Sequence, residues 1–165
     1  MSPAIVRGAA AADAAGIAAI YNHYVTNTIV TFDEEPLPAE EFARRIEATL
    51  GEGMPWLVAE RDGVVVGYSY ATKWKARRGY RFSAEVTVYL APDAGGQGIG
   101  SLLYTPLLDE LKRMGMHTAL GGIALPNDSS IALHEKLGFE KVAHFKQTGI
   151  KFGQWIDVGY WEKIL

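Results

Sequence analysis

The most regular pattern of hydrophobic and polar positions lies between Phe82 and Leu90, where the two kinds of residue alternate. Strict alternation predicts a β-strand, because successive side chains of a strand point to opposite faces of the sheet. The apolar face of this strand consists of Phe82, Ala84, Val86, Val88 and Leu90. The opposite face consists of Ser83, Glu85, Thr87 and Tyr89. The strand therefore presents a carboxylate and hydroxyl groups on its polar side.

Apolar residues three or four positions apart predict four helices in the rest of the chain. The first begins at Asp13, its expected N-cap, and has an apolar face of Ile17, Ile20, Tyr21 and Tyr24. The second is marked by Phe42, Ile46 and Leu50, and the third by Leu103, Leu107, Leu111 and Met114. The fourth covers 127–137 and closes at Gly138. Shorter apolar runs predict further strands at 4–7, 56–60, 64–71, 118–123, 139–148 and 155–163.

The composition is that of an ordinary globular chain and excludes several classes of protein. With 165 residues, 48% of them hydrophobic and 21% charged, the chain is expected to form one domain over residues 1–165. It has no cysteine, so it offers no disulfide or thiolate, and a reducing cytoplasm is expected. No stretch is apolar enough to span a membrane, and the net charge of −3 disfavours a nucleic-acid partner. His23, His117 and His144 lack metal-ligand spacing, so no metal is expected.

A glycine-rich loop, Gly95-Gly96-Gln97-Gly98-Ile99-Gly100, joins the alternating strand to the third predicted helix. Glycines let main-chain N–H groups converge on an anion at a positive helix N-terminus, so the loop indicates a ligand with phosphate groups. A nucleotide-binding P-loop is disfavoured because Ser101 follows Gly100 where that motif has a lysine. A dinucleotide-binding fold is disfavoured because its third glycine would also fall on Ser101. Taken alone, the loop is equally consistent with a plain tight turn.

The order of motifs along the chain resembles the GNAT superfamily of acyl-CoA-dependent N-acetyltransferases. The resemblance is carried by Val86-Thr87-Val88-Tyr89-Leu90, the glycine loop, Asn127-Asp128-Ser129-Ser130 and the stretch 133–139. Matches to the phosphinothricin and methionine sulfoximine/sulfone N-acetyltransferase branch lie at 20–25, 74–77, 85–89, 151–153 and 155–159. The resemblance implies an α/β (α+β) fold with a mixed, mostly antiparallel sheet of six or seven strands. About four helices would flank the sheet, a CoA cleft would splay it, and the chain would form a homodimer.

In this family the glycine loop holds the pyrophosphate of CoA on main-chain N–H groups. The resemblance implies this role for Gly96, Gln97, Gly98, Ile99, Gly100 and Ser101. The chain departs from the family pattern at Gly95, where a Gln or Arg is usual.

The pantetheine arm of CoA is expected to lie against strand 82–90 and the start of the fourth helix. By resemblance, the strand carries a bulge and leaves the backbone of Val88, Tyr89 and Leu90 free to pair with pantetheine. Asn127 is expected to bind pantetheine, to cap a helix, or to do both. Lys136 would meet a CoA phosphate or remain a solvated lysine.

Glu85 is the residue to which we assign catalysis. An attacking ammonium group must first lose a proton, and a carboxylate on the central strand can accept it. Without the family, Glu85 would be a solvent-facing strand residue. His134 occupies the position of the family residue that protonates the departing thiolate, and the alternative is a helix histidine bonded to a neighbour.

The basic run 73–81 precedes Glu85 and is interpreted as part of the acceptor site. Lys75, Ala76 and Arg77, with Arg78 beside them, would attract a substrate carboxylate or phosphinate. The amine end of the acceptor would lie against Glu85, Val86 and Thr87, and Phe32 and Glu34 are candidates for the opposite wall. A solvated loop is the alternative interpretation of the run.

The expected reaction is acetyl transfer from acetyl-CoA to the amino group of a small amino acid or analogue. One rival is an acetyltransferase for protein N-termini or polyamines. The other, from a different class, is a non-catalytic acyl-CoA-binding module.

Overall fold

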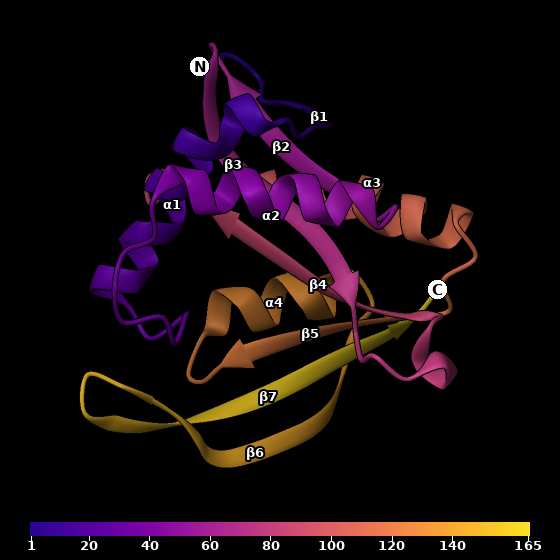
Figure 1. Ribbon diagram of the computed structural model, residues 1–165. Coiled ribbons are helices and arrows are strands. Elements are labelled where there is room, and N and C mark those ends of the chain that lie inside the picture. The colour runs from indigo at the N-terminus through magenta and orange to yellow at the C-terminus, as the bar shows by residue number, and fades with distance from the viewer.

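The computed structural model describes residues Met1–Leu165 and shows a seven-stranded sheet with helices packed against it (Figure 1). The strands lie in the order β1-β2-β3-β4-β5-β7-β6. Their bounds are Ile5–Gly8 (β1), Trp56–Arg61 (β2), Val64–Lys73 (β3), Ser83–Leu90 (β4), Thr118–Ala124 (β5), Glu140–Lys151 (β6) and Gln154–Ile164 (β7). The helices are Ala14–Asn27 (α1), Ala39–Gly51 (α2), Ile99–Arg113 (α3) and Asp128–Lys136 (α4), with short 3₁₀ turns at Ala11–Asp13 (η1) and Arg78–Tyr80 (η2).

All neighbouring strands pair antiparallel except β4 and β5, which run parallel. This confirms the mixed, mostly antiparallel sheet with four flanking helices. None of the helices combines the length and the apolar character that crossing a membrane requires.

Different helices cover the two faces of the sheet. On one face α1 and α2 pack over a core that includes Trp56, Val58 and Tyr68. On the other face α3 packs over Ala84 and Val86 of β4. The alternation in the sequence is thereby confirmed, because the apolar side of β4 is buried under α3 and its polar side faces the α1–α2 layer.

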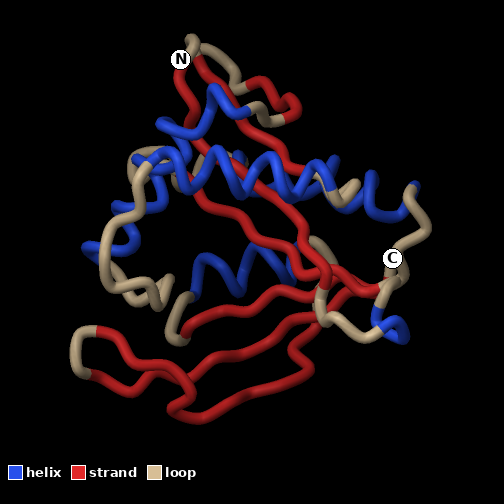
Figure 2. The backbone as a smooth tube through the Cα atoms, viewed as in Figure 1, coloured by secondary structure: helices blue, strands red, loops and turns tan.

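Strands β4 and β5 separate after a short stretch of pairing. Their register covers only Ser83–Glu85 against Thr118–Leu120, after which β4 stays with β3 and β5 stays with β7. Figure 2 shows the two strands diverging, with α4 beside the gap. We call this divergence the fork, and it confirms the expected splay of the sheet.

The bulge expected in strand 82–90 is absent from its pairing with β3, so that prediction is wrong. The β3–β4 register runs without interruption from Gly67↔Leu90 to Lys73↔Ala84. The splay comes from lost pairing with β5 and from a glycine of β5 that admits α4. A Cβ atom at Gly121 would lie only 2.7 Å from Nε2 of His134, so a side chain there would push α4 away.

The closing strands are longer than the sequence predicted. β6 runs on to Lys151 because Phe152 and Gly153 form a two-residue turn with positive φ angles of 51° and 71°. Such a turn matches the twist of the flanking strands and so allows a tight hairpin. The β6–β7 pairing is irregular between Phe145 and Gly149. Because the alternation of side chains is broken there, the sequence pattern did not predict the end of β6.

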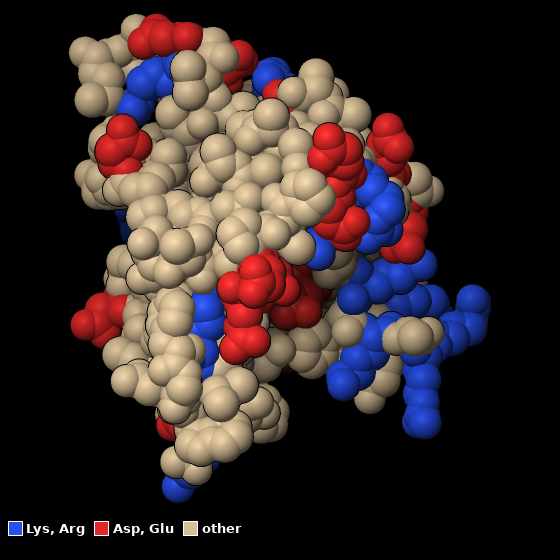
Figure 3. Space-filling view, turned by 60° about the vertical axis from the view of Figure 1, so that its left-hand side comes forward, with Lys and Arg blue, Asp and Glu red and all other residues tan.

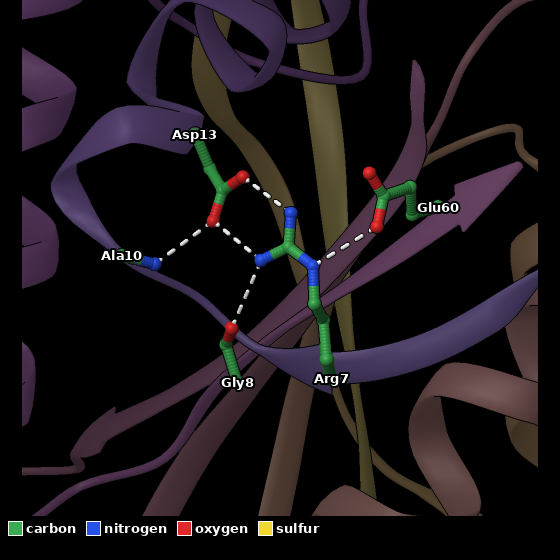
Figure 4. Close-up of polar contacts among 5 residues, drawn as sticks. All are labelled: Arg7, Gly8, Ala10, Asp13 and Glu60. Carbon is green, nitrogen blue, oxygen red and sulfur yellow. Dashed lines mark hydrogen bonds and ion pairs between the residues drawn. The ribbon is translucent and has the colours of Figure 1, made fainter. Parts of the chain in front are cut away.

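Asp13 occupies the N-cap position of α1, as predicted, but its side chain makes no capping hydrogen bond to that helix. Its carboxylate accepts the N–H of Ala10 at 2.8 Å and two hydrogen bonds from the Arg7 guanidinium at 2.8 and 2.9 Å (Figure 4). Arg7 also donates to Glu60 at 3.1 Å, and the hydrogen bonds from Arg7 to Asp13 lower the pKa of the Asp13 carboxyl. The acidic residue therefore fixes the η1 turn and ties it to β1 and β2, because the guanidinium competes successfully for its oxygens.

Candidate active site

A small cavity lies at the fork, between β4, β5 and α4. It has a volume of about 70 Å³, and we call it the fork cavity. Its lining consists of Val30, Glu85, Val86, Thr87, Val88, Tyr89, Tyr104, Gly122, Ile123, Ala124, Asn127, Ser130 and His134. The structure therefore brings both predicted catalytic residues, Glu85 and His134, to one cavity.

Glu85 is the last residue of β4 that pairs with β5, opposite Leu120. Its side chain is half-buried, and burial raises the pKa of its carboxyl above the ordinary range. No cation offsets this effect, since desolvation is the one cause that acts on the group. A carboxylate with a raised pKa and no partner is suited to accept a proton near neutral pH.

His134 is 3% exposed and has both ring nitrogens engaged. Nδ1 lies 2.7 Å from the carbonyl oxygen of Ser130, and Nε2 lies 3.1 Å from the hydroxyl of Tyr104. A carbonyl can only accept, so the imidazole proton sits on Nδ1 and Nε2 accepts the Tyr104 O–H. Burial lowers the pKa of His134, which keeps the ring neutral. The alternative of a helix histidine bonded to a neighbour therefore holds in this structure, inside the fork cavity.

A second, open space continues from the fork cavity toward the glycine loop, and we call it the cofactor cleft. Its volume is about 380 Å³. It is lined by Tyr24, Val30, Val88, Tyr89, Leu90, Ala91, Pro92, Gly95, Gly96, Gly98, Gly100, Ser101, Asn127, Ser129, Ser130, Leu133 and Lys136. Most of the residues predicted to hold CoA thus border one cleft.

The glycine loop delivers main-chain donors to this cleft. Gly96 and Gly98 have positive φ angles of 72° and 78°, which glycine adopts without strain, and α3 begins directly afterwards. The first N–H groups of a helix have no partner inside it and carry its positive end. The side chain of Gln97 turns away, accepting from Arg61 at 2.9 Å, and Ile99 is buried, so these two residues offer only their amides. The loop fits a pyrophosphate group.

Asn127 caps α4, as one of its two interpretations predicts. Its Oδ1 accepts from the main-chain N–H of Ser130 at 3.2 Å and from the hydroxyl of Ser129 at 3.1 Å. Its amide NH₂ has no partner and remains available to a ligand carbonyl in the cleft. The carbonyl of Leu90 already accepts a hydrogen bond from Tyr24 at 2.5 Å. Lys136 is exposed on the rim of the cleft.

A third space, the aromatic cavity, lies between α2 and the sheet and has a volume of about 400 Å³. Its lining consists of Tyr21, Phe42, Arg44, Arg45, Ala48, Thr49, Trp56, Tyr68, Tyr70, Thr72, Thr87, Tyr89 and Gly122. Trp56 stacks on Tyr70 with ring centres 4.2 Å apart, and its buried Nε1 has no hydrogen-bond partner. Thr87, Tyr89 and Gly122 also line the fork cavity, so the two spaces adjoin there.

The predicted acceptor-binding run Lys75–Arg77 lies on an exposed loop and lines none of these three spaces. Aromatic contacts nevertheless connect it to the fork. The Nζ of Lys75 lies 5.2 Å from the ring centre of Trp74, which packs edge-on against Tyr160 at 5.3 Å. Figure 3 shows Lys and Arg side chains gathered on one flank, next to a recess with acidic side chains.

Tyr160 in turn lies against the fork, since a Cβ at Gly122 would come within 3.1 Å of its ring. The basic loop therefore lies at the rim of the site and does not form a wall of any of the three spaces.

Phe32 and Glu34, between α1 and α2, are exposed and also lie outside the three linings. Val30 of their loop borders both the fork cavity and the cofactor cleft. No group of three or more metal-ligating side chains gathers anywhere in the structure.

Comparison with known proteins decides what this combination of cavity, cleft and loop is. Residues 6–159 match the acetyltransferase (GNAT) domain family. The chain belongs to the GNAT acetyltransferase family. It is therefore an N-acetyltransferase with acetyl-CoA as its acyl donor, as the resemblance implied.

Three relatives illustrate its place in the GNAT family. The chain is 42% identical to a phosphinothricin N-acetyltransferase of Streptomyces viridochromogenes, covering 98% of this chain and 87% of the relative. It is 38% identical to an L-methionine sulfoximine/L-methionine sulfone acetyltransferase of Salmonella typhimurium, covering 94% and 91%. A crystal structure of a phosphinothricin acetyltransferase from Sinorhizobium meliloti with acetyl-CoA superposes with a TM-score of 0.95 at 38% identity, covering 100% and 89%.

Sequence reasoning missed Tyr104, Tyr24 and the aromatic cavity. Tyr104 had a weak signal, because it places a hydroxyl next to Leu103 in the apolar stripe of the third predicted helix. No sequence pattern indicated that Arg45, Trp56 and Tyr70 belong to the site. They come from three separate elements, and only the packing of α2 over β2 and β3 brings them together.

Proposed function

We propose that this GNAT enzyme transfers the acetyl group of acetyl-CoA to the α-amino group of a small amino acid or analogue, with Glu85 as general base. The observation that carries the proposal is the meeting of three spaces at β4. Tyr89 lines the fork cavity, the cofactor cleft and the aromatic cavity, and Thr87 lines the first and third. An amine near Thr87 would lie between a donor in the cleft and the unpaired carboxylate of Glu85.

The acceptor class rests on the relatives and on the size of the cavity. The relatives are named for phosphinothricin and for methionine sulfoximine and sulfone, which share an α-amine with a polar or charged tail. An aromatic cavity of about 400 Å³ suits a small molecule and is at the lower end of usual ligand sites. Lys75, Ala76 and Arg77 at the rim would attract the carboxylate or phosphinate, while Val86 and Thr87 contact the amine end.

Acetyl-CoA, when bound, supplies the thioester carbonyl carbon that the amine attacks. Amides of Gly96–Ser101 hold its pyrophosphate, Val88 and Tyr89 border its pantetheine arm, and Asn127 donates its free amide N–H there. Glu85 accepts the proton that the ammonium group loses, directly or through one water. Tyr104 and His134 both line the fork cavity, and the Tyr104 hydroxyl, turned away from Nε2, can donate a hydrogen bond to the departing sulfur. The amine attacks the thioester directly, since the chain has no cysteine and no serine in a nucleophile elbow.

A thiol-release assay with acetyl-CoA tests this function. The acceptor panel contains L-phosphinothricin, L-methionine sulfoximine, L-methionine sulfone, ordinary amino acids, spermidine and a peptide with a free N-terminus. Fast release with the amino-acid group supports the proposal. A preference for the peptide or spermidine would favour the rival acetyltransferases, and acetyl-CoA binding without any turnover would favour a binding module.

We also propose that the chain works as one domain, in the cytoplasm and as a homodimer. The absence of cysteine agrees with a reducing compartment. Exposed apolar side chains on the β6–β7 hairpin, including Val142, Phe145, Phe152 and Trp155, suit a protein interface. Light scattering after size-exclusion chromatography measures the oligomeric state directly.

A further inference from the structure

One buried lysine takes no part in the proposed reaction. Lys151, at the end of β6, belongs to the motif Lys151-Phe152-Gly153 and is only 1% exposed. Its ammonium group donates to the carbonyl oxygens of Thr28 at 3.0 Å and Thr31 at 2.6 Å. No carboxylate forms an ion pair with it. A buried lysine is rare in proteins, so its position calls for a reason.

The two carbonyls belong to the irregular segment 28–38 between α1 and α2, which we call the α1–α2 loop. This loop and Lys151 lie more than a hundred positions apart in the sequence. Buried main-chain carbonyls outside helices and sheets need partners, because no regular element supplies them. Lys151 therefore joins the β6–β7 hairpin to the α1–α2 loop through main-chain atoms that any loop sequence would offer.

The segment held in this way borders the active site. Val30 lies between the two anchored residues and lines both the fork cavity and the cofactor cleft. The side chain of Thr31 is hydrogen-bonded at 2.7 Å to the hydroxyl of Tyr21, which lines the aromatic cavity. Tyr21 also donates to Asp33 further along the loop.

The hairpin meets the same loop at a second point. The ring of Phe32 lies over Gly149, where an added Cβ would come within 2.3 Å of the ring. The ammonium of Lys151 also lies 5.0 Å from the ring centre of Phe152. The β6–β7 hairpin and the α1–α2 loop therefore pack against each other, and Lys151 makes the polar contacts between them.

We propose that Lys151 is a positioning residue of the acetyltransferase site, whose buried ammonium fixes the α1–α2 loop so that Val30 closes the junction of fork cavity and cofactor cleft. The inference rests on the proposed function, because it requires the acceptor amine to reach Glu85 at that junction. Lys151 touches neither substrate. It acts through the Thr28 and Thr31 carbonyls and the loop they belong to.

Lys151→Met tests the proposal, because methionine keeps nearly the length of lysine but has no hydrogen to donate. We expect kcat/KM for the best acceptor to fall about 10²-fold, the loss that a displacement of about 1 Å in an active site can cause. The acceptor KM should rise with it. Acetyl-CoA affinity by calorimetry should fall much less than acceptor kcat/KM, since the Gly96–Ser101 amides that hold the pyrophosphate do not belong to the loop and only Val30 of the loop borders the cofactor cleft. Lys146→Met, at an exposed lysine of the same strand, is the matched control and should behave like the wild type.

Lys151→Cys provides a second measurement, made selective by the absence of any other cysteine. Alkylation in denaturant with 2-bromoethylamine rebuilds an ammonium at the length of lysine, and 1-iodopropane gives a neutral side chain of the same length that has no hydrogen to donate. After refolding, the aminoethylated protein should regain most of the acceptor kcat/KM, whereas the neutral one should not.

Three results would overturn the proposal. The first is a wild-type acceptor KM in Lys151→Met, and the second is equal activity of the two alkylated proteins. The third is a neutral variant that cannot fold while the aminoethylated one does, which would make Lys151 a residue of stability alone. Failure of the proposed function is distinct, because the wild-type enzyme would then acetylate no amino acid at all.

Discussion

The hydroxyl of Tyr104 donates to Nε2 of His134 across 3.1 Å, and the two side chains are 1% and 3% exposed. Because Ser130 fixes the other ring nitrogen, the direction of this bond is set by the fold. A neutral His134 has no proton to give from Nε2. The hydroxyl of Tyr104 can therefore reach a departing thiolate only by turning away from Nε2, and because burial raises the pKa of that phenol well above its ordinary value, it would stabilise the thiolate as a hydrogen-bond donor.

Tyr104→Phe removes this hydrogen while keeping the ring that packs against Phe139. We expect kcat to fall at least about 10-fold, below the full 10²–10⁴-fold range of acid catalysis because the thiolate is a good leaving group. The acceptor KM and the affinity for acetyl-CoA should stay near their wild-type values. Steady-state kinetics with the best acceptor, and calorimetry for acetyl-CoA, measure the three quantities. An unchanged kcat would leave Tyr104 as a packing residue.

The lowered pKa of His134 predicts how stability depends on pH. Burial disfavours the charged ring in the folded state, so the unfolded chain binds more protons once the pH falls below the ordinary histidine value of about 6.5. This contribution to the free energy of unfolding is present above that pH and decreases as the pH falls toward the lower folded-state pKa. Urea unfolding of the wild type and His134→Gln at about pH 7.5 and 5.5 isolates it, because other titrating groups cancel in the difference. A parallel loss in both proteins would contradict the assignment.

The sequence predicted the secondary structure well where the pattern was local. Alternation in 82–90 predicted β4 and its two faces, and the glycine loop predicted an anion site at the start of α3. Asp13 was correctly placed at the start of α1, but the partner of its side chain was not predicted, because a capping aspartate and a partner for Arg7 have the same sequence signature. Only the pairing of β1 with β2, which brings Arg7 and Glu60 together, distinguishes the two roles.

The site was predictable in part for the same reason. Glu85, Asn127 and the glycine loop follow from a strand, a cap and a turn, each of which is a local feature. The partnership of Tyr104 with His134 depends on two helices meeting, and the contacts of Lys151 span more than a hundred positions. No periodicity records such distances, so these parts of the site required the fold.

Gly98→Asp tests the cofactor cleft. Gly98 has a φ angle of 78° and open space around it, and Asp adopts such an angle more readily than most residues. The added carboxylate would lie where the amides hold the pyrophosphate, so we expect acetyl-CoA binding to be lost while the fold is kept. Gly98→Asn has the same shape without the charge and is the matched control, with weaker but measurable binding. Calorimetry that finds equal affinities for both variants would argue against a pyrophosphate at this loop.

The exposed basic loop can be separated from the aromatic cavity by comparing acceptors with different tails. Lys75→Gln combined with Arg77→Gln should lower kcat/KM about tenfold for phosphinothricin, whose tail is anionic, and little for methionine sulfone, whose tail is neutral. Because these cations are exposed, the selective loss should shrink in about 0.5 M salt. Arg45→Gln, at a cation that lines the aromatic cavity, serves as the comparison. A selective loss in Arg45→Gln instead would move the anionic tail into that cavity.

Glu85→Gln tests the general base. The amide keeps the size and hydrogen-bonding capacity of the carboxylate but cannot accept a proton, so kcat/KM should fall about 10²–10⁴-fold near neutral pH. Because burial raises the pKa of Glu85, the wild-type rate should decline at a higher pH than an exposed glutamate would give as the solution is acidified. The deficit of the variant should shrink as the pH approaches the pKa of the acceptor amine, since free amine then needs no base. Acetyl-CoA affinity should be unchanged, because the amides that hold it lie beyond the end of β4. The measurement is a pH–rate profile of both proteins on one acceptor. If Glu85→Gln has the wild-type rate at pH 7, Glu85 is a structural residue. If the variant loses the same fraction of its rate at every pH, Glu85 acts in binding rather than in proton transfer.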